Sequence, residues 1–121
     1  MRRLTIHRKK ALAGFAVPYF CFIDTDMTSF CGKMPHEDFI TRADENYAVS
    51  FKNGESKTML IDDEQHVLSA VIWRQVGNYV MLPALVPAGT EDLSYSLITD
   101  YNGNDVLEFY LRRDEEVKAD E

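Results

Sequence analysis

The sequence predicts an all-β fold: an antiparallel β-sandwich, Ig-like or jelly-roll-like, or a partly open barrel, with about eight short strands. Three observations support this prediction. Apolar and polar residues alternate in short runs, turn-forming residues follow each run, and helical periodicity is almost absent. The 121 residues leave no room for crossover helices between strands, which disfavours a βαβ scaffold.

The expected strands follow one another along the chain, each bounded by turn residues. The run 17–24 is apolar on both faces, so we expect it to be central or covered by another element. Asn53-Gly54 is a strong hairpin signal because both residues tolerate a positive φ, and Asn102-Gly103-Asn104 predicts a second tight turn. A helix of a turn or two is expected within 36–44, where the preceding Pro35 suits a helix start. The strands are expected near 3–9, 17–24, 47–52, 59–61, 66–74, 79–82, 93–101 and 106–112.

Charge is unevenly distributed along the chain. There are 13 Lys and Arg against 20 Asp and Glu, which gives a formal net charge of −7. Residues 1–20 hold five basic residues and no acid, so that segment is +5 and the remainder is −12. This balance does not suit binding of nucleic acid through a general basic field. We expect one β-sandwich domain over 1–113, with its first basic residues exposed along a sheet edge, and a solvated acidic tail over 114–121.

The uncharged stretch 11–23 follows the basic start and imitates a signal peptide. It holds 13 residues and is interrupted by Gly14 and Pro18, so we expect neither a signal peptide nor a transmembrane segment, and favour a cytoplasmic protein. Cys21 lies in an apolar run and is expected in the core, whereas Cys31 lies in a loop. We favour a reduced pair and leave a disulfide between them open. The sequence contains no P-loop or G-x-G-x-x-G, and we expect no cofactor.

Several short motifs resemble those of small bacterial all-β domains of uncharacterised function. The matching motifs are Arg8-Lys9-Lys10, Gly14, Pro18-Tyr19, Phe22-Ile23-Asp24, Lys52-Asn53-Gly54-Glu55, His66 and the stretch from Asn78 to Gly89. The chain is also distantly similar to PEGA-type surface domains. The resemblance implies a β-sandwich and no enzymatic activity. Two features depart from it: Asp63-Glu64-Gln65 replaces a glycine before the histidine, and the segment 25–45 is inserted after Ile23-Asp24.

The inserted segment 25–45 is the expected location of a site, because loops on a rigid β scaffold commonly carry function. A metal would draw its ligands from Cys31, His36, Glu37 and Asp38, although no C-x-x-C and no second His at ligand spacing accompany them. A thiol-dependent hydrolase would instead pair Cys31 with His36 or His66. The alternative interpretation is a polar loop whose apolar residues pack onto the sheet.

Two acidic turns are expected to be structural. His66 follows one of them and is expected to donate a hydrogen bond to Asp62 or Asp63, which would fix the turn. Asp24-Thr25-Asp26 resembles half of a calcium loop but lacks the glycine and the distal glutamate, so it predicts a turn cap.

Two further surfaces are candidates for binding. A flat aromatic platform for sugar rings would consist of Trp73, Tyr79 and Tyr95, with a core or interface role as the alternative. The apolar stretch 81–88 carries two prolines, which prevent pairing as a central strand, so we expect it to be buried or to cover a partner. A homodimer contact is therefore expected at Leu82, Leu85 and Val86.

Three classes of function follow from these observations. The favoured class is a non-enzymatic binding module that contacts a protein or a glycan. The first alternative is a small metal-dependent or thiol-dependent hydrolase built on the segment 25–45. The second alternative is an accessory protein of an envelope or membrane system, whose contacts with anionic lipid would come from Arg2, Arg3, Lys9 and Lys10.

Overall fold

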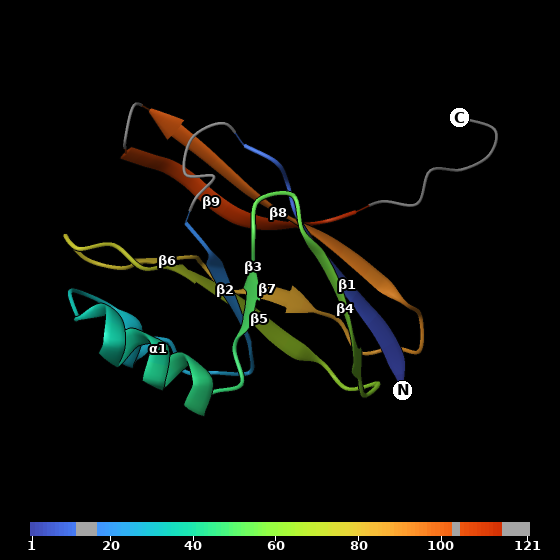
Figure 1. Cartoon of the computed structure of the whole chain (residues 1–121). Coiled ribbons are helices and arrows are strands. Elements are labelled where there is room, and N and C mark those ends of the chain that lie inside the picture. Colours follow the sequence, from blue (N-terminus) through green and yellow to red (C-terminus); the bar gives the residue numbers. More distant parts are fainter. Residues whose placement is uncertain (12–16, 103–104, 115–121) are drawn as a thin grey trace.

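The described residues of the computed structural model are 1–11, 17–102 and 105–114. They form nine strands, one α-helix and one short 3-10 helix, so the all-β prediction is confirmed (Figure 1). In chain order the elements are β1 (Arg2–Arg8), β2 (Tyr19–Ile23), η1 (Thr28–Phe30), α1 (His36–Glu45), β3 (Val49–Phe51), β4 (Ser56–Ile61), β5 (His66–Ile72), β6 (Tyr79–Val80), β7 (Ala84–Val86), β8 (Leu93–Asn102) and β9 (Asp105–Arg113).

The strands make two sheets. The first sheet has four strands in the order β4-β1-β8-β9. The second sheet has five strands, with β3-β2-β5-β6 in order and β7 also paired to β5. One pairing departs from the predicted antiparallel pattern, because β1 runs parallel to β8 from Leu4 opposite Leu93 to Arg8 opposite Leu97. The other strand pairs are antiparallel.

The first strand is an interior strand, which corrects the prediction of a basic sheet edge. It lies between β4 and β8, and its residues Arg2 and Arg8 are only 3% and 1% exposed. The Arg8 guanidinium lies over the Tyr19 ring, 3.4 Å from the centroid, and donates to the carbonyl oxygens of Val17 and Phe51 at 2.6 and 2.8 Å. These contacts let a guanidinium take a core position on the same face as Leu4 and Ile6.

The turn at Asn53-Gly54 is present, but the predicted hairpin is wrong. The Glu55 amide donates to the Lys52 carbonyl at 3.0 Å, and Gly54 has a φ of +77°. The flanking strands do not pair with each other, because β3 belongs to the second sheet and β4 to the first. The turn therefore carries the chain from one sheet to the other.

The apolar stretch 81–88 contributes a strand that the sequence did not predict. Residues 84–86 form β7 between Pro83 and Pro87, and pair antiparallel with residues 66–68 of β5. Strands β6 and β7 both pair with the same side of β5, so each is short and neither pairs with a further described strand. The prolines that flank β7 are therefore tolerated at an edge of the sheet. The predicted strand 79–82 is shortened to Tyr79–Val80.

The main core lies between the two sheets. It takes alternate residues from strands of both, as the period of two in the sequence requires. The cluster includes Leu4, Ile6, Tyr19, Cys21, Phe51, Leu68, Ala70, Ile72, Met81, Val86, Tyr95, Leu97 and Phe109. The prediction that Cys21 lies in the core is confirmed.

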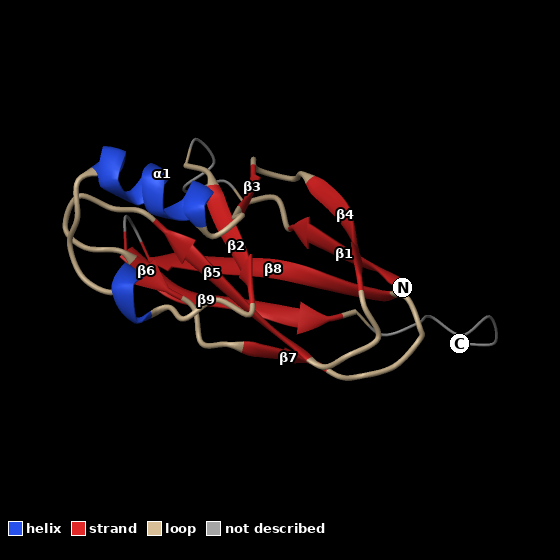
Figure 2. Ribbon diagram, turned by 90° about the horizontal axis from the view of Figure 1, so that it is seen from below, coloured by secondary structure: helices blue, strands red, loops and turns tan. Residues whose placement is uncertain are grey.

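A second core joins the helix to the outer face of the second sheet. Phe22 and Val71 meet Phe30, Phe39 and Ala43 there, so the strand predicted to be apolar on both faces is covered on both (Figure 2). The helix spans ten residues, longer than the turn or two expected. Phe39 and Ala43 are four apart and therefore share its buried face.

Of the predicted acidic tail, only the first residue lies within the described residues. Asp114 is held by the first sheet, because its carboxylate accepts hydrogen bonds from Ser94 and Ser96 at 2.8 and 2.7 Å. The rest of the predicted acidic tail, together with Gly14 and Gly103-Asn104, lies outside the described residues. Within the described ranges, no helix has the length and apolar character needed to cross a membrane.

Candidate functional site

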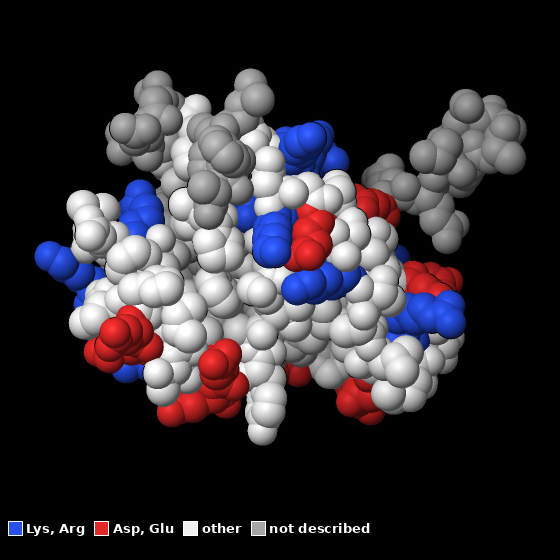
Figure 3. All heavy atoms as spheres, viewed as in Figure 1, with Lys and Arg blue, Asp and Glu red and all other residues white. Residues whose placement is uncertain are grey.

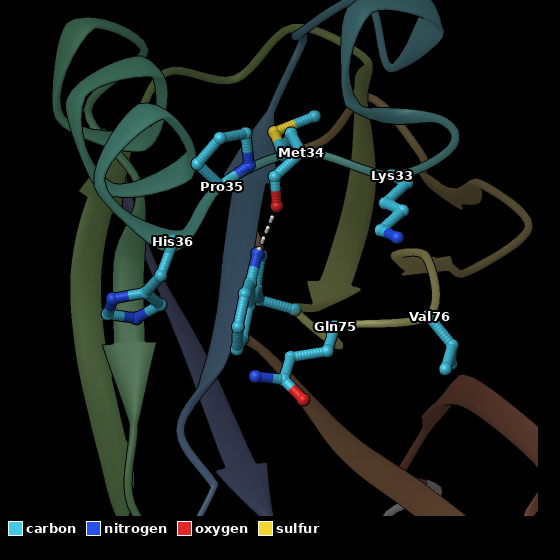
Figure 4. A pocket seen from close by; sticks show the side chains of 7 residues that line it. Lys33, Met34, Pro35, His36, Gln75 and Val76 are labelled. Atoms are coloured by element: carbon cyan, nitrogen blue, oxygen red, sulfur yellow. Dashed lines mark hydrogen bonds between the residues drawn. The ribbon is translucent and has the colours of Figure 1, made fainter.

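An open hollow of the described surface lies where the start of α1 meets the segment after β5. It has a volume of about 710 Å³ and is widely open to solvent. In Figure 4, residues 33–36 approach it from the helix start, and Gln75 and Val76 from the opposite segment. We call it the Trp73 pocket, and its lining residues are Lys33, Met34, Pro35, His36, Trp73, Gln75 and Val76.

Backbone contacts lock the two sides of the pocket together. The Asn78 amide donates to the Gly32 carbonyl at 2.7 Å, and the Asn78 side chain donates to the Phe30 carbonyl at 2.9 Å. Gly77 turns the chain with a φ of +135°, and a Cβ there would meet the Gly32 carbonyl oxygen at 3.7 Å. The turn after β5 is therefore fastened to the segment before α1.

The indole of Trp73 is fixed within this frame. Its Nε1–H donates to the Met34 carbonyl oxygen at 2.9 Å, as the dashed line in Figure 4 marks. The His36 ring meets it edge-on, with centroids 4.8 Å apart and planes at 72°. Lys33, His36 and Gln75 supply polar groups around an otherwise apolar lining. This combination suits non-covalent binding, in which an apolar floor gives affinity and a few polar groups orient the ligand.

The four predicted metal ligands do not converge. Cys31 Sγ donates to the Met27 carbonyl at 3.5 Å, and the His36 ring packs against Trp73. Glu37 and Asp38 are exposed in the first turn of α1, where negative charge favours the positive end of the helix. Among the described residues, no group of three or more His, Cys, Asp or Glu side chains is arranged to hold a metal ion.

The thiol–imidazole pairing does not form in this structure either. The Cys31 thiol is exposed and bonded to backbone, while both nitrogens of His66 are bonded to carboxylates. Cys21 is buried, and burial raises the pKa of its thiol to about 12. Both cysteines are free, as favoured from the sequence.

The predicted aromatic platform is wrong for Tyr95. That ring is 2% exposed in the main core, and its hydroxyl donates to the Leu85 carbonyl at 3.0 Å. Tyr79 is half-buried against Phe109 in the same core, with ring centroids 6.0 Å apart. Trp73 belongs to the second core, on the other face of the sheet. Tyr79 and Tyr95 face the main core whereas Trp73 packs into the second, so Trp73 alone of the three lines the candidate site.

A second polar cluster surrounds His66. Its Nδ1 lies 2.6 Å from Asp24 Oδ2, and its Nε2 lies 2.6 Å from Asp62 Oδ1. The bond to Asp62 was predicted, whereas Asp24, 42 residues away, was not. Asp24 also accepts the Val67 amide at 2.8 Å, and Asp62 accepts the Glu64 amide at 3.0 Å. We call this group the His66 clasp, since it ties the ends of β2 and β4 to the start of β5.

The clasp favours charge on all three members. The hydrogen bond with Asp24 raises the pKa of His66 most, burial opposes this rise, and the bond with Asp62 adds to it. Partial burial works against ionisation of Asp24, but the bonds from His66 and Val67 outweigh it and lower the pKa of the carboxyl. The Glu64 amide and then His66 lower the pKa of Asp62. Two carboxylate acceptors require both ring nitrogens to donate, so the bonded form is imidazolium.

The basic start offers fewer exposed cations than its sequence indicates. Arg2 is buried, and its guanidinium donates to the carbonyls of Asp62, Glu64 and Pro87 at 3.2, 2.9 and 2.8 Å. Arg3, Lys9 and Lys10 are exposed. On the face seen in Figure 3, acidic and basic side chains are interspersed.

The predicted apolar interface divides into exposed and buried residues. Leu82 and Leu85 are 87% and 56% exposed, whereas Val86 is buried in the main core. Alternation along β7 explains the difference between Leu85 and Val86, because neighbouring residues point to opposite faces, and Leu82 lies before the strand. Only the two leucines remain candidates for contact with a partner.

Most of the Trp73 pocket was not predicted from the sequence. Lys33, Met34, Gln75 and Val76 carry no motif, and the contact between their two segments depends on Asn78. The dipeptide Gly77-Asn78 predicted a turn, but no feature of the sequence indicated that the Asn78 amide would bond the Gly32 carbonyl. Comparison with models of protein families, with curated proteins and with solved structures found no match.

Proposed function

We propose that the chain is a non-enzymatic binding module, and that the Trp73 pocket holds an apolar side chain of a partner protein. The observation that carries this proposal is the fixed indole at an open pocket, held by its bond to Met34. A preorganised aromatic side chain binds at low entropic cost, because no rotamer freedom is lost on association.

The lining chemistry favours a protein segment over a glycan. Met34, Pro35 and Val76 make much of the wall apolar, and Val76 is largely exposed. Trp and Met are enriched at protein interfaces, where a few such residues supply most of the binding energy. Lys33 at the rim would favour an acidic residue beside the apolar anchor.

The single tryptophan provides a direct test. A displayed library of random peptides is selected on the protein, and the emission of Trp73 is followed during titration with each selected peptide. Peptides with an apolar anchor are expected to shift the emission and to saturate. Val76→Glu places a charge in the pocket and is expected to weaken binding at least tenfold, a difference of about 1.4 kcal/mol.

A matched control separates pocket binding from general loss of structure. Leu60→Glu introduces the same charge at another exposed apolar side chain, on β4, and is expected to leave affinity unchanged. Peptides that bind Val76→Glu as tightly as wild type, or without any change in Trp73 emission, contradict the proposal. Binding of glycans in place of peptides contradicts the choice of ligand.

We further propose that the two sheets form a β-sandwich, Ig-like or jelly-roll-like, as the resemblance to small bacterial β-sandwich domains implies. The support is that side chains of both sheets interdigitate in one core. An experimental structure in which the two sheets pack at close to a right angle would contradict it.

A homodimer through β7 is a second proposal, favoured by the exposure of Leu82 and Leu85 beside a short edge strand. Two copies could bury these leucines against each other. Sedimentation equilibrium is expected to show a dimer for wild type and a monomer for Leu85→Lys. A monomeric wild type at high concentration contradicts this proposal.

A further inference from the structure

A second, smaller hollow opens between the two sheets at the side where β3 and β4 form their edges. The two strands diverge from the turn 52–55 (Figure 1), and the hollow lies between the sheets they border. It has a volume of about 160 Å³ and is more enclosed than the Trp73 pocket. We call it the edge slot, and it is lined by Ile6, Cys21, Ile23, Asn46, Tyr47, Val49 and Met59.

The edge slot reaches the main core. Ile6 and Cys21 at its base are buried, and Ile23, Val49 and Met59 on its walls pack against the same core. The slot is therefore lined by aliphatic and sulfur-bearing side chains except at Asn46 and Tyr47. Its volume of about 160 Å³ is large enough for a molecule the size of benzene.

The exposed ring of Tyr47 at the slot is the second observation that points to a ligand. Tyr47 follows the end of α1 with a φ of +56°, a left-handed conformation that helices commonly give to glycine at this position. The Tyr47 amide donates to the Asp44 carbonyl at 3.1 Å, and the Ala48 amide donates to the Ala43 carbonyl at 3.0 Å. These two bonds form a Schellman cap, so the helix end itself accounts for the left-handed backbone of Tyr47 and holds the residue in place.

The strain at Tyr47 is not offset by packing of its side chain. The ring is 90% exposed, although it stands at the mouth of the slot. Among the described residues, the other non-glycine position with positive φ is Asp24, whose carboxylate bonds His66 and Val67. The cap therefore holds an exposed aromatic ring at the mouth of the slot, in a position to pack over a bound molecule.

We propose that the edge slot binds one aromatic ring of a small molecule and that Tyr47 packs over the bound ring. Sulfur atoms of Cys21 and Met59 on the walls favour an aromatic ring over an aliphatic one, because sulfur–aromatic contacts are attractive. Tyr47 adds a ring–ring contact at the mouth. The lining residues are distinct from those of the Trp73 pocket, so this site does not depend on the proposed function.

Benzene is the probe for the first test, applied to the wild-type protein. It is expected to raise the melting temperature and to shift the methyl resonances of Ile6 and Met59, with both effects saturating at the same concentration. Cyclohexane is expected to bind more weakly. Absence of a saturable shift at these methyl groups overturns the site, and equal binding of cyclohexane overturns the aromatic preference.

Tyr47→Gly is the decisive variant, because it should change stability and binding in opposite directions. Glycine relieves the left-handed strain, so the melting temperature without ligand is expected to rise. Loss of the ring is expected to weaken benzene binding by up to about tenfold, which is what one aromatic contact supplies. A variant that is less stable and binds benzene as wild type would show that Tyr47 has a structural role only, and would overturn the proposal.

A matched pair of substitutions on β3 locates the site. Val49→Phe fills the slot and is expected to abolish the benzene shifts, whereas Ser50→Phe, one residue along and exposed, is expected to keep them. Retention of the shifts in a folded Val49→Phe overturns the location. If that variant does not fold, the methyl resonances of the wild type decide the question alone.

Discussion

Replacing His66 with glutamine tests the clasp that joins the ends of β2 and β4 to the start of β5. Glutamine has a similar length but carries no positive charge, so it cannot reproduce the imidazolium between Asp24 and Asp62. We expect His66→Gln to fold normally and to be less stable than wild type under mildly acidic conditions.

The pH dependence of this difference follows from the direction of each pKa shift. The pKa of His66 is raised above its ordinary value of 6.5. Its contribution is therefore fully present below about pH 6.5 and is lost as pH rises through the folded-state pKa. The pKa values of Asp24 and Asp62 are lowered from 3.8. Their contributions are present above about pH 4 and are lost at lower pH, so the clasp is strongest between about pH 4 and 6.5.

The magnitude is modest because solvent screens the partners of His66. The imidazole is 12% exposed, but the Asp24 side chain is 49% exposed. An ion pair of this kind contributes about 0.5–1 kcal/mol. Unfolding entropy of about 2.1 cal/mol/K per residue gives roughly 250 cal/mol/K for 121 residues. The expected fall in melting temperature is therefore about 2–4 °C.

Thermal unfolding of both proteins at about pH 5.5 and about pH 9 is the assay. We expect the difference between them to shrink at the higher pH. Asp24→Asn keeps an oxygen to accept the Val67 amide, so a double-mutant cycle with His66→Gln isolates the charge interaction. An equal difference at both pH values, or a His66 pKa below 6.5 by NMR, would refute the reasoning.

Three further predictions concern the cores and the turn. Phe39→Ala empties a fully buried position between Phe20 and Phe30, and is expected to lower the free energy of unfolding by about 3–5 kcal/mol in urea denaturation; a loss below about 1 kcal/mol would contradict close packing of the helix on the sheet. Gly54→Ala forces a side chain into a φ of +77°, although its Cβ would meet only ordinary contacts at 3.9 Å, and denaturation is expected to show a loss of about 1–2 kcal/mol from backbone strain alone. A bulky thiol reagent is expected to label Cys31 in the native protein and Cys21 only after unfolding, because the Cys21 thiol is buried and its pKa is raised to about 12. Rapid labelling of both cysteines in the native protein would contradict this prediction.

Local chemistry in the sequence was sufficient to predict most strands and turns. Alternation located β1, β5, β8 and β9 to within a few residues, and Asn53-Gly54 located a turn. The turn residues could not reveal which sheet receives the next strand, because that choice depends on distant pairing with β1. The same limit applies to β1 itself, because arginine in a strand is typical of an exposed edge. The partners that allow burial, the Tyr19 ring for Arg8 and three backbone carbonyls for Arg2, are brought close only by the fold.

The candidate site was predictable only in part. Trp73 and His36 stood out as chemistry-bearing residues, and both line the pocket. The other lining residues could not be identified, because the pocket forms between the segment before α1 and the segment after β5. These segments are far apart in sequence and are joined by the hydrogen bonds of Asn78. No sequence pattern predicted the edge slot, because most of its lining residues are ordinary core residues. The left-handed φ of Tyr47 could be learned only from the structure.

The parallel pairing of β1 with β8 has a consequence for how the chain folds during synthesis. The Arg3 amide bonds Asp92, 89 residues later. The side of β1 that faces β8 therefore stays open until most of the chain has been made. At about 5–20 residues per second, the interval between Arg8 and Leu93 lasts roughly 4–17 s on the ribosome. During that time the β8-facing side of the segment that carries Leu4 and Ile6 has no partner strand within its own chain, so pairing with another chain competes with folding.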